Sequence, residues 1–73
     1  MSPETWALHF NRARAYGILQ QWPQAVTGYR EAARLFPDDY VTQFNLAKAL
    51  QAAGDLPAAL AAYEKAKIGR AHV

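Results

Sequence analysis

Apolar residues recur at three- and four-residue steps in four stretches of the chain, with short Gly-, Pro- or Asp-containing segments between them. Such steps place apolar side chains on one face of an α-helix. The first stretch follows Ser2-Pro3-Glu4, where the serine can cap and the proline suits the first helical position, and we expect it to end near Gln20. Its apolar positions are Trp6, Phe10, Ala13, Tyr16 or Gly17, and Ile18.

The second stretch starts at Trp22-Pro23, because proline disfavours helix in the residue before it and belongs in a first turn. It should run to about Leu35 and bury Ala25, Val26, Tyr29, Ala32 and Ala33.

Pro37 stops the second helix, and an aspartate of Asp38-Asp39 is expected to cap the third, over about residues 40–53. The apolar set of this third helix is Val41, Phe44, Leu46, Ala47 and Leu50. Gly54-Asp55 then turns the chain into a fourth helix, which begins near Leu56-Pro57. The fourth helix carries Ala59, Leu60, Tyr63 and Ala66.

The second half of the chain repeats the first with a period of 34 residues. Unit one covers about residues 6–39 and unit two about residues 40–67. A period in this range is typical of solenoid arrays, in which each unit buries its apolar face against its neighbours. The coinciding positions are Phe10/Phe44, Asn11/Asn45, Ala13/Ala47, Ala15/Ala49, Pro23/Pro57, Ala25/Ala59, Tyr29/Tyr63 and Ala32/Ala66.

This repeat resembles the tetratricopeptide repeat, a two-helix unit with the signature W-x2-L-G-x2-Y, then A-x3-F, then Pro. The signature places in unit one are held by His9, Arg12, Ala13, Tyr16, Ala25, Tyr29 and Pro37, with Ala32 at a place where the family prefers a small residue. In unit two they are held by Gln43, Leu46, Ala47, Leu50, Ala59 and Tyr63, with Ala66 at the small-residue place.

Unit one departs from the family pattern at several places. Arg12 stands where the family has leucine, His9 and Gln43 stand where it often has tryptophan, and the turn of unit one lacks a glycine. The resemblance still implies an all-α fold: two tandem helix-turn-helix units, with four antiparallel helices, forming a fragment of a right-handed α-solenoid.

Composition excludes several classes of protein. A chain of 73 residues has room for one small domain, and a net charge of +2 with both signs interspersed does not indicate a nucleic-acid partner. The basic residues Arg12, Arg14, Arg30, Arg34 and Lys48 should divide between the two helix layers. No apolar run approaches the roughly 20 residues that a bilayer requires, so no membrane partner is expected. If Met1 is the true start, we expect a cytoplasmic product.

The repeat pattern stops after Lys67. The remaining six residues, Ile68-Gly69-Arg70-Ala71-His72-Val73, are similar to the translation of a common short-read sequencing adapter. We therefore interpret residues 68–73 as a non-native tail and expect the natural protein to continue beyond Lys67.

No catalytic constellation, metal site or cofactor motif is recognisable, so we do not expect an enzyme. Asp38 and Asp39 lack a third ligand nearby, which favours helix capping over metal binding. His9 is isolated on a helix, where packing or surface exposure is far commoner than ligation. Trp6 and Trp22 are interpreted as packing residues, because core or edge packing of a tryptophan is commoner than a binding cage.

In tetratricopeptide arrays the first helix of each unit lines a concave groove that holds peptides. Asn11 and Asn45 occupy equivalent places on these helices, and Arg14 and Lys48 follow one turn later on the same face. Asparagine both donates and accepts hydrogen bonds, so such a pair can bind a peptide backbone whatever its sequence. The expected peptide-binding residues are Phe10, Asn11, Arg14, Phe44, Asn45 and Lys48.

This asparagine pair resembles the ladder in the superhelix of O-linked N-acetylglucosamine transferase. It does not resemble the chaperone-tail carboxylate clamp, because Phe10 stands where that clamp has lysine. The alternative reading is that these asparagines belong to the family's consensus and favour the fold.

The resemblance implies a non-catalytic scaffold that binds an extended peptide or a segment of a protein partner. The second hypothesis is an accessory region of a larger, truncated enzyme such as a glycosyltransferase. Nothing in the pattern caps the last helix, so its outer face, with Leu60 and Ala61, should be exposed and allow self-association.

Overall fold

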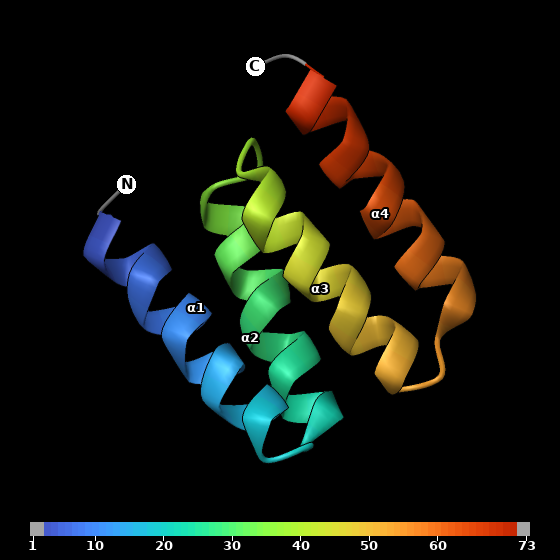
Figure 1. Ribbon diagram of the computed structural model, residues 1–73. Coiled ribbons are helices and arrows are strands. Elements are labelled where there is room, and N and C mark those ends of the chain that lie inside the picture. The colour runs from blue at the N-terminus through green and yellow to red at the C-terminus, as the bar shows by residue number, and fades with distance from the viewer. Residues whose placement is uncertain (1–2, 72–73) are drawn as a thin grey trace.

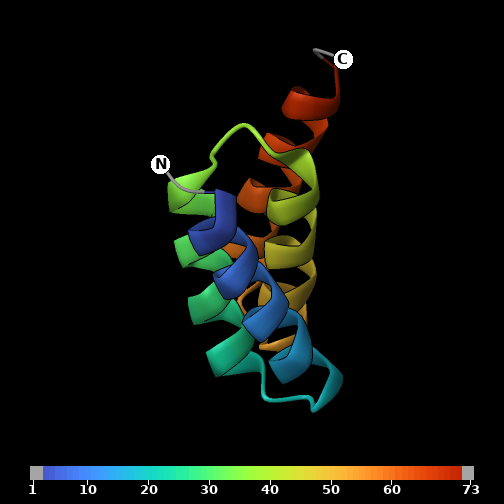
Figure 2. The same cartoon turned by 90° about the vertical axis from the view of Figure 1, so that its left-hand side faces the viewer.

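The computed structural model describes residues 3–71, which form four α-helices arranged as two antiparallel hairpins (Figure 1). The helices pack in chain order, α1 on α2, α2 on α3 and α3 on α4. Figure 2 shows α2 displaced to one side of α1 and α3, so the helices do not lie in a single plane. The predicted all-α fold of two helical hairpins is confirmed. The bounds are α1 Pro3–Ile18, α2 Trp22–Leu35, α3 Tyr40–Ala52 and α4 Leu56–Ala71.

The helix starts follow the predicted capping chemistry. Asp39 caps α3, because its carboxylate accepts hydrogen bonds from the Val41 amide at 3.3 Å and the Thr42 hydroxyl at 2.7 Å. Asp55 accepts a hydrogen bond from the Ala58 amide at 3.3 Å at the start of α4. Gln21, the residue equivalent to Asp55, makes no side-chain cap bond. The predicted cap at Ser2 lies outside the described residues.

The first helix of each unit ends in the same way. α1 ends at Ile18, two residues earlier than expected, and Gln20 then adopts a left-handed conformation with φ 60°. Its equivalent Gly54 has φ 91°. Both ends show the hydrogen bonds of a Schellman motif. They are Gln20 N–H to Gly17 O (3.0 Å), Gln21 N–H to Tyr16 O (2.9 Å), Gly54 N–H to Gln51 O (3.1 Å) and Asp55 N–H to Leu50 O (2.9 Å).

Small residues let the paired helices approach closely. A Cβ atom added to Gly28 would lie 2.8 Å from the Ala13 Cβ, so α1 and α2 meet backbone to backbone at this point. Gly17 has no such role, because an added Cβ there would make only an ordinary 3.5 Å contact with Trp22. The predicted burial is confirmed for Ala13, Ala25, Tyr29, Ala47 and Ala59, whereas Tyr63 is half-buried.

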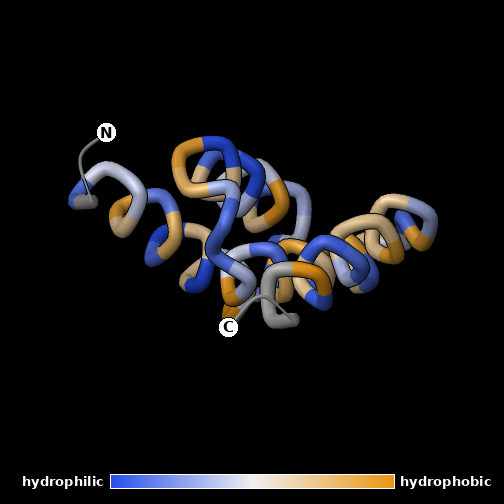
Figure 3. The backbone as a smooth tube through the Cα atoms, turned by 90° about the horizontal axis from the view of Figure 1, so that it is seen from above, coloured by the Kyte–Doolittle hydropathy of each residue, from blue (hydrophilic) through white to orange (hydrophobic). Residues whose placement is uncertain are grey.

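Membership of a helical apolar set does not always correspond to burial. Ile18, Val41 and Phe44 are exposed, although they belong to the helical apolar sets. The polar residues Thr42 and Gln43 are buried instead. The reason is that α3 packs between α2 and α4, so its buried surface extends round more of the helix than one apolar stripe. Figure 3 accordingly shows hydrophobic and hydrophilic residues on every helix.

The outer face of α4 has no neighbour among the described residues. Leu60 is 60% exposed and Ala61 is also exposed, as predicted. α4 continues through Ala71, past the point at which the repeat pattern stops. His72 and Val73 lie outside the described residues, and the interpretation of residues 68–73 as a non-native tail stays a prediction.

Candidate functional site

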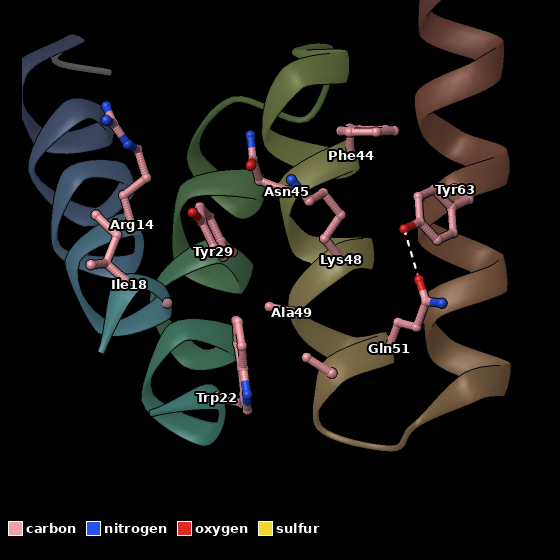
Figure 4. Close-up of a pocket in the computed structure, with 12 residues that line it drawn as sticks. Arg14, Ile18, Trp22, Tyr29, Phe44, Asn45, Lys48, Ala49, Gln51 and Tyr63 are labelled. Atoms are coloured by element: carbon pink, nitrogen blue, oxygen red, sulfur yellow. Dashed lines mark hydrogen bonds between the residues drawn. The ribbon is translucent and has the colours of Figure 1, made fainter. Parts of the chain in front are cut away.

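A groove of about 860 Å³ lies between α1 and α3, with residues of α2 at its floor (Figure 4). α1 and α3 are the first helices of the two units, so the groove occupies the face expected for a concave binding surface. It is lined by Arg14, Gly17, Ile18, Trp22, Tyr29, Phe44, Asn45, Lys48, Ala49, Gln51, Ala52 and Tyr63.

Four of the six expected peptide-binding residues line this groove: Arg14, Phe44, Asn45 and Lys48. Arg14 lines it from α1, while the other three come from α3 (Figure 4). Asn11 is exposed on α1 but is not among the lining residues. The structure therefore places only one of the two equivalent asparagines in the groove.

Phe10, the sixth expected residue, packs against other aromatic rings. Its ring stacks on Trp6 with 5.2 Å between centroids and packs edge to face with Tyr29 at 5.6 Å. Trp6 in turn contacts Phe36 edge to face at 5.9 Å. Phe10 is half-buried in this cluster and does not line the groove, which supports a packing role.

Asn45 is held by its own helix. Its side-chain amide donates a hydrogen bond to the Val41 carbonyl at 2.9 Å. This bond uses one of the two amide hydrogens and leaves the side-chain oxygen available to accept a bond from a ligand. The side chain extends from α3 towards the floor residue Tyr29 (Figure 4).

An aromatic wall closes the α4 side of the groove. The rings of Phe44 and Tyr63 meet edge to face at 5.6 Å, and the Tyr63 hydroxyl donates a hydrogen bond to Gln51 at 3.0 Å. The Lys48 ammonium lies 5.7 Å from the centre of the Phe44 ring, within the range of a cation–π interaction. The Lys48 ammonium and the Phe44 ring therefore lie next to each other at this wall of the groove.

The groove is electropositive. Arg14 and Lys48 are exposed, neither forms an ion pair with a described residue, and none of the described lining residues is acidic. Burial raises the pKa of Tyr29 at the floor, and the nearby positive charge of Arg14 partly offsets this by lowering it. The Tyr29 hydroxyl therefore stays neutral at physiological pH and can donate a hydrogen bond.

The ion pair that the described residues do form lies on α2, between Arg34 and Glu31. Hydrogen bonds from Arg34 lower the pKa of Glu31, and Glu31 in turn raises the pKa of Arg34. This pair is solvent-exposed and outside the groove. Arg30 is also on α2, so the basic side chains are spread over more than one surface.

Sequence reasoning missed the floor and the far end of the groove. Trp22 and Tyr29 were assigned to packing, yet both also line the groove. Gly17 and Ile18 follow Arg14 by three and four residues, and Gln51 and Ala52 stand in the same relation to Lys48. Helical periodicity would have found these four residues if the predicted face had been extended by one turn.

Within the range 3–71, no group of three or more His, Asp and Glu side chains is placed to hold a metal ion. None of the described helices combines the length and apolar character needed to cross a membrane.

The comparison with protein families supports the resemblance. Residues 40–65 match the family model of the tetratricopeptide repeat. The curated proteins and the solved structures contain no significant match to the chain. The matched range covers α3 and nearly all of the unit-two part of α4, and the α1–α2 hairpin repeats it at the 34-residue period. The α3–α4 hairpin therefore matches the tetratricopeptide repeat, a family whose members build protein-interaction modules.

Proposed function

We propose that this chain is a non-catalytic interaction scaffold that binds an extended, acidic or neutral peptide in the groove between α1 and α3. The observation that carries the proposal is the groove itself, which places Arg14, Asn45 and Lys48 around an aromatic floor. An extended peptide can offer its backbone to Asn45 and its carboxylates to the two cations. The groove is open, so we expect micromolar or weaker affinity.

Fluorescence anisotropy with a library of labelled extended peptides of differing charge tests the proposal. We expect acidic peptides to bind better than basic ones, and their binding to weaken as salt rises. Asn45→Ala should cost about 1 kcal/mol, roughly a fivefold rise in Kd, which is the contribution of one hydrogen bond. Arg14→Glu and Lys48→Glu should each weaken the binding of acidic peptides and strengthen the binding of basic ones.

Matched charge reversals away from the groove provide the control. Arg30 on α2 and Lys65 on α4 are exposed and do not line the groove, so Arg30→Glu and Lys65→Glu should leave peptide binding unchanged. Equal losses in the groove variants and the controls would show that net charge alone attracts the peptides. An unchanged Kd for Asn45→Ala would indicate that Asn45 favours the fold and does not bind the peptide.

The second hypothesis, an accessory region of a larger enzyme, uses the same groove and the same peptide chemistry. The transcript downstream of the Lys67 codon separates the two, since a catalytic domain encoded there would establish an accessory role. The cytoplasmic location expected if Met1 is the true start stays a prediction.

Self-association is a weaker second mode of contact that the exposed face of α4 supports. Leu60 is exposed there, and burying a leucine stabilises an interface by about 1.5–3 kcal/mol. We propose loose association at high concentration, which sedimentation velocity over a range of concentrations would detect.

A further inference from the structure

The groove between α1 and α3 changes in character along its length. Arg14 and Lys48 are equivalent residues of the repeat, and both line the groove. Four residues later on the same two helices come Ile18 and Ala52, which are also equivalent and also line it. Ile18 is 75% exposed, so its side chain can contact a ligand. A cationic part of the groove is therefore followed, one helical turn further on, by an apolar part.

The apolar part is built around Trp22, the first residue of α2. Trp22 is half-buried, because one part of its ring packs on the core while another part lines the groove. Figure 4 shows the ring on the α2 side of the groove and Ala49 opposite it on α3. We define the apolar subsite as Gly17, Ile18, Trp22, Ala49 and Ala52.

Gly17 leaves part of the Trp22 ring uncovered. A Cβ atom added to Gly17 would lie 3.5 Å from Cζ3 of this ring, which is ordinary van der Waals contact. Because glycine has no such atom, a methyl-sized space stays open against the ring. In unit two the equivalent residues are Gln51 and Leu56, so the glycine and the ring occur together only in unit one.

The spacing of the two parts matches that of an extended peptide. Residues four apart on a helix are separated by about 6 Å along its axis. Alternate residues of an extended strand point to the same side and are separated by about 7 Å. The helices α1 and α3 run in the same direction, so the step from cation to apolar residue has the same sense on both (Figure 1). A peptide side chain facing the cations thus has its second neighbour facing the apolar subsite.

The chemistry of the apolar subsite favours an apolar side chain over a cationic one. An exposed tryptophan ring can attract a cation as well as an apolar group. Here, however, Arg14 and Lys48 stand one turn away and would repel a second cation. An acidic side chain would in turn be drawn to these two residues and away from the ring.

We propose that the apolar subsite holds a large apolar side chain of the bound peptide, two residues from an acidic side chain that Arg14 and Lys48 hold. The apolar side chain contacts the Trp22 ring beside Gly17 and is flanked by Ile18. This inference rests on the proposed function, because it names the sequence feature that the same groove selects in its peptide.

Three labelled peptides with blocked termini and identical flanks test the proposal by fluorescence anisotropy. The first has the core Leu-Thr-Asp-Thr-Leu, which places a leucine two residues from the aspartate in either chain direction. The second, Thr-Leu-Asp-Leu-Thr, has the same composition but turns both leucines to the other side of the strand. The third, Ala-Thr-Asp-Thr-Ala, lacks them. We expect the first to bind about tenfold more tightly than the other two, because only its leucine is buried.

Variants of Gly17 test the same site from the protein side. Gly17→Leu fills the space beside the ring and should raise the Kd of the first peptide to that of the third. Gly17→Ala should have a smaller effect in the same direction. It should not lower Tm, because alanine is favoured over glycine in a helix, so its weaker binding cannot be due to unfolding.

Ala15→Leu is the matched control, because Ala15 is exposed on α1 and does not line the groove. It should leave all three Kd values unchanged. Arg14→Glu should weaken the three peptides by the same factor, since all carry the aspartate.

The outcomes separate the subsite from the groove. Equal Kd values for the three peptides would overturn the apolar subsite and leave the proposed function standing. Tight binding of the first peptide that Gly17→Leu weakens no more than Ala15→Leu would place the leucine elsewhere, and it would also overturn the subsite. Failure of every peptide to bind would overturn the proposed function and the subsite together.

Discussion

Thr42 is a polar residue with no exposed surface, and its hydroxyl group connects the two hairpins. It accepts a hydrogen bond from the Trp6 indole on α1 at 3.1 Å and donates one to the Asp39 carboxylate at 2.7 Å. One side chain therefore serves the cap of α3 and the contact between the units. Neither role is visible in the helical apolar pattern, which treats Thr42 as an outward-facing position.

Thr42→Val should lower the free energy of unfolding by about 1–3 kcal/mol, because the shape is kept while the Trp6 indole and Asp39 lose a partner. Urea denaturation followed by circular dichroism measures the change. Thr27→Val is the control, since the exposed Thr27 hydroxyl donates only to the Pro23 carbonyl of its own helix. A loss for Thr42→Val no larger than that for Thr27→Val would show that the link between the hairpins contributes nothing.

At the scale of the element, α1 and α3 end with the same backbone geometry but with different residues. After each of these helices the chain reverses through a left-handed residue, which is Gln20 in unit one and Gly54 in unit two. A left-handed conformation costs roughly 1–2 kcal/mol for a residue with a Cβ atom and little for glycine. Unit one therefore stores strain at a position where unit two has none.

Gln20→Gly should raise the free energy of unfolding by about 0.5–1 kcal/mol, because relief of the strain exceeds the extra entropy of glycine in the unfolded chain. Gly54→Ala should lower it by about 1 kcal/mol. No atom lies within 4 Å of a Cβ placed on Gly54, so the loss would come from the backbone conformation alone. Urea denaturation tests both variants, and a destabilised Gln20→Gly protein would contradict the strain argument.

At the scale of the whole molecule, the two ends differ in character. The α1 side presents the charged or polar His9, Arg12 and Glu31 beside an exposed Leu8, whereas the α4 side presents Leu60 and Phe44. A polar outer surface is what a terminal unit of a solenoid requires, and an apolar one suits an internal unit. The stability of so small a domain is limited, so one uncovered leucine matters to the total.

Replacing residues 68–73 with a second copy of residues 34–67 should sharpen the thermal transition and raise Tm. The added unit would cover Leu60 and contribute about 1.5–3 kcal/mol from that side chain alone. The control protein carries Leu46→Arg only in the added copy, and its Tm should rise little. A sharp, concentration-independent melt of the 73-residue chain above about 65 °C would instead show that the uncovered outer face of α4 costs no stability.

Much of the fold was predictable because it depends on local chemistry. The helical periods, the alanines where helices meet, the Asp39 cap and the Gly54 turn follow from residue types a few positions apart. The end of α1 was harder to predict, since glutamine rarely adopts the conformation that Gln20 has. In the groove, Arg14, Asn45 and Lys48 were predictable from the repeat, whereas Trp22 and Gln51 were missed because the expected face was one turn too short.

The sequence by itself determined the four helices, the 34-residue repeat and the alanines at which the helices meet, because these depend on neighbours along the chain. Only the tertiary structure decided the role of each equivalent residue. Val26 and Leu60 occupy the same place in the repeat, yet Val26 is 7% exposed and Leu60 is 60% exposed. The physical reason is that burial depends on whether another helix covers the face, and in the described chain α3 covers only the face of unit one.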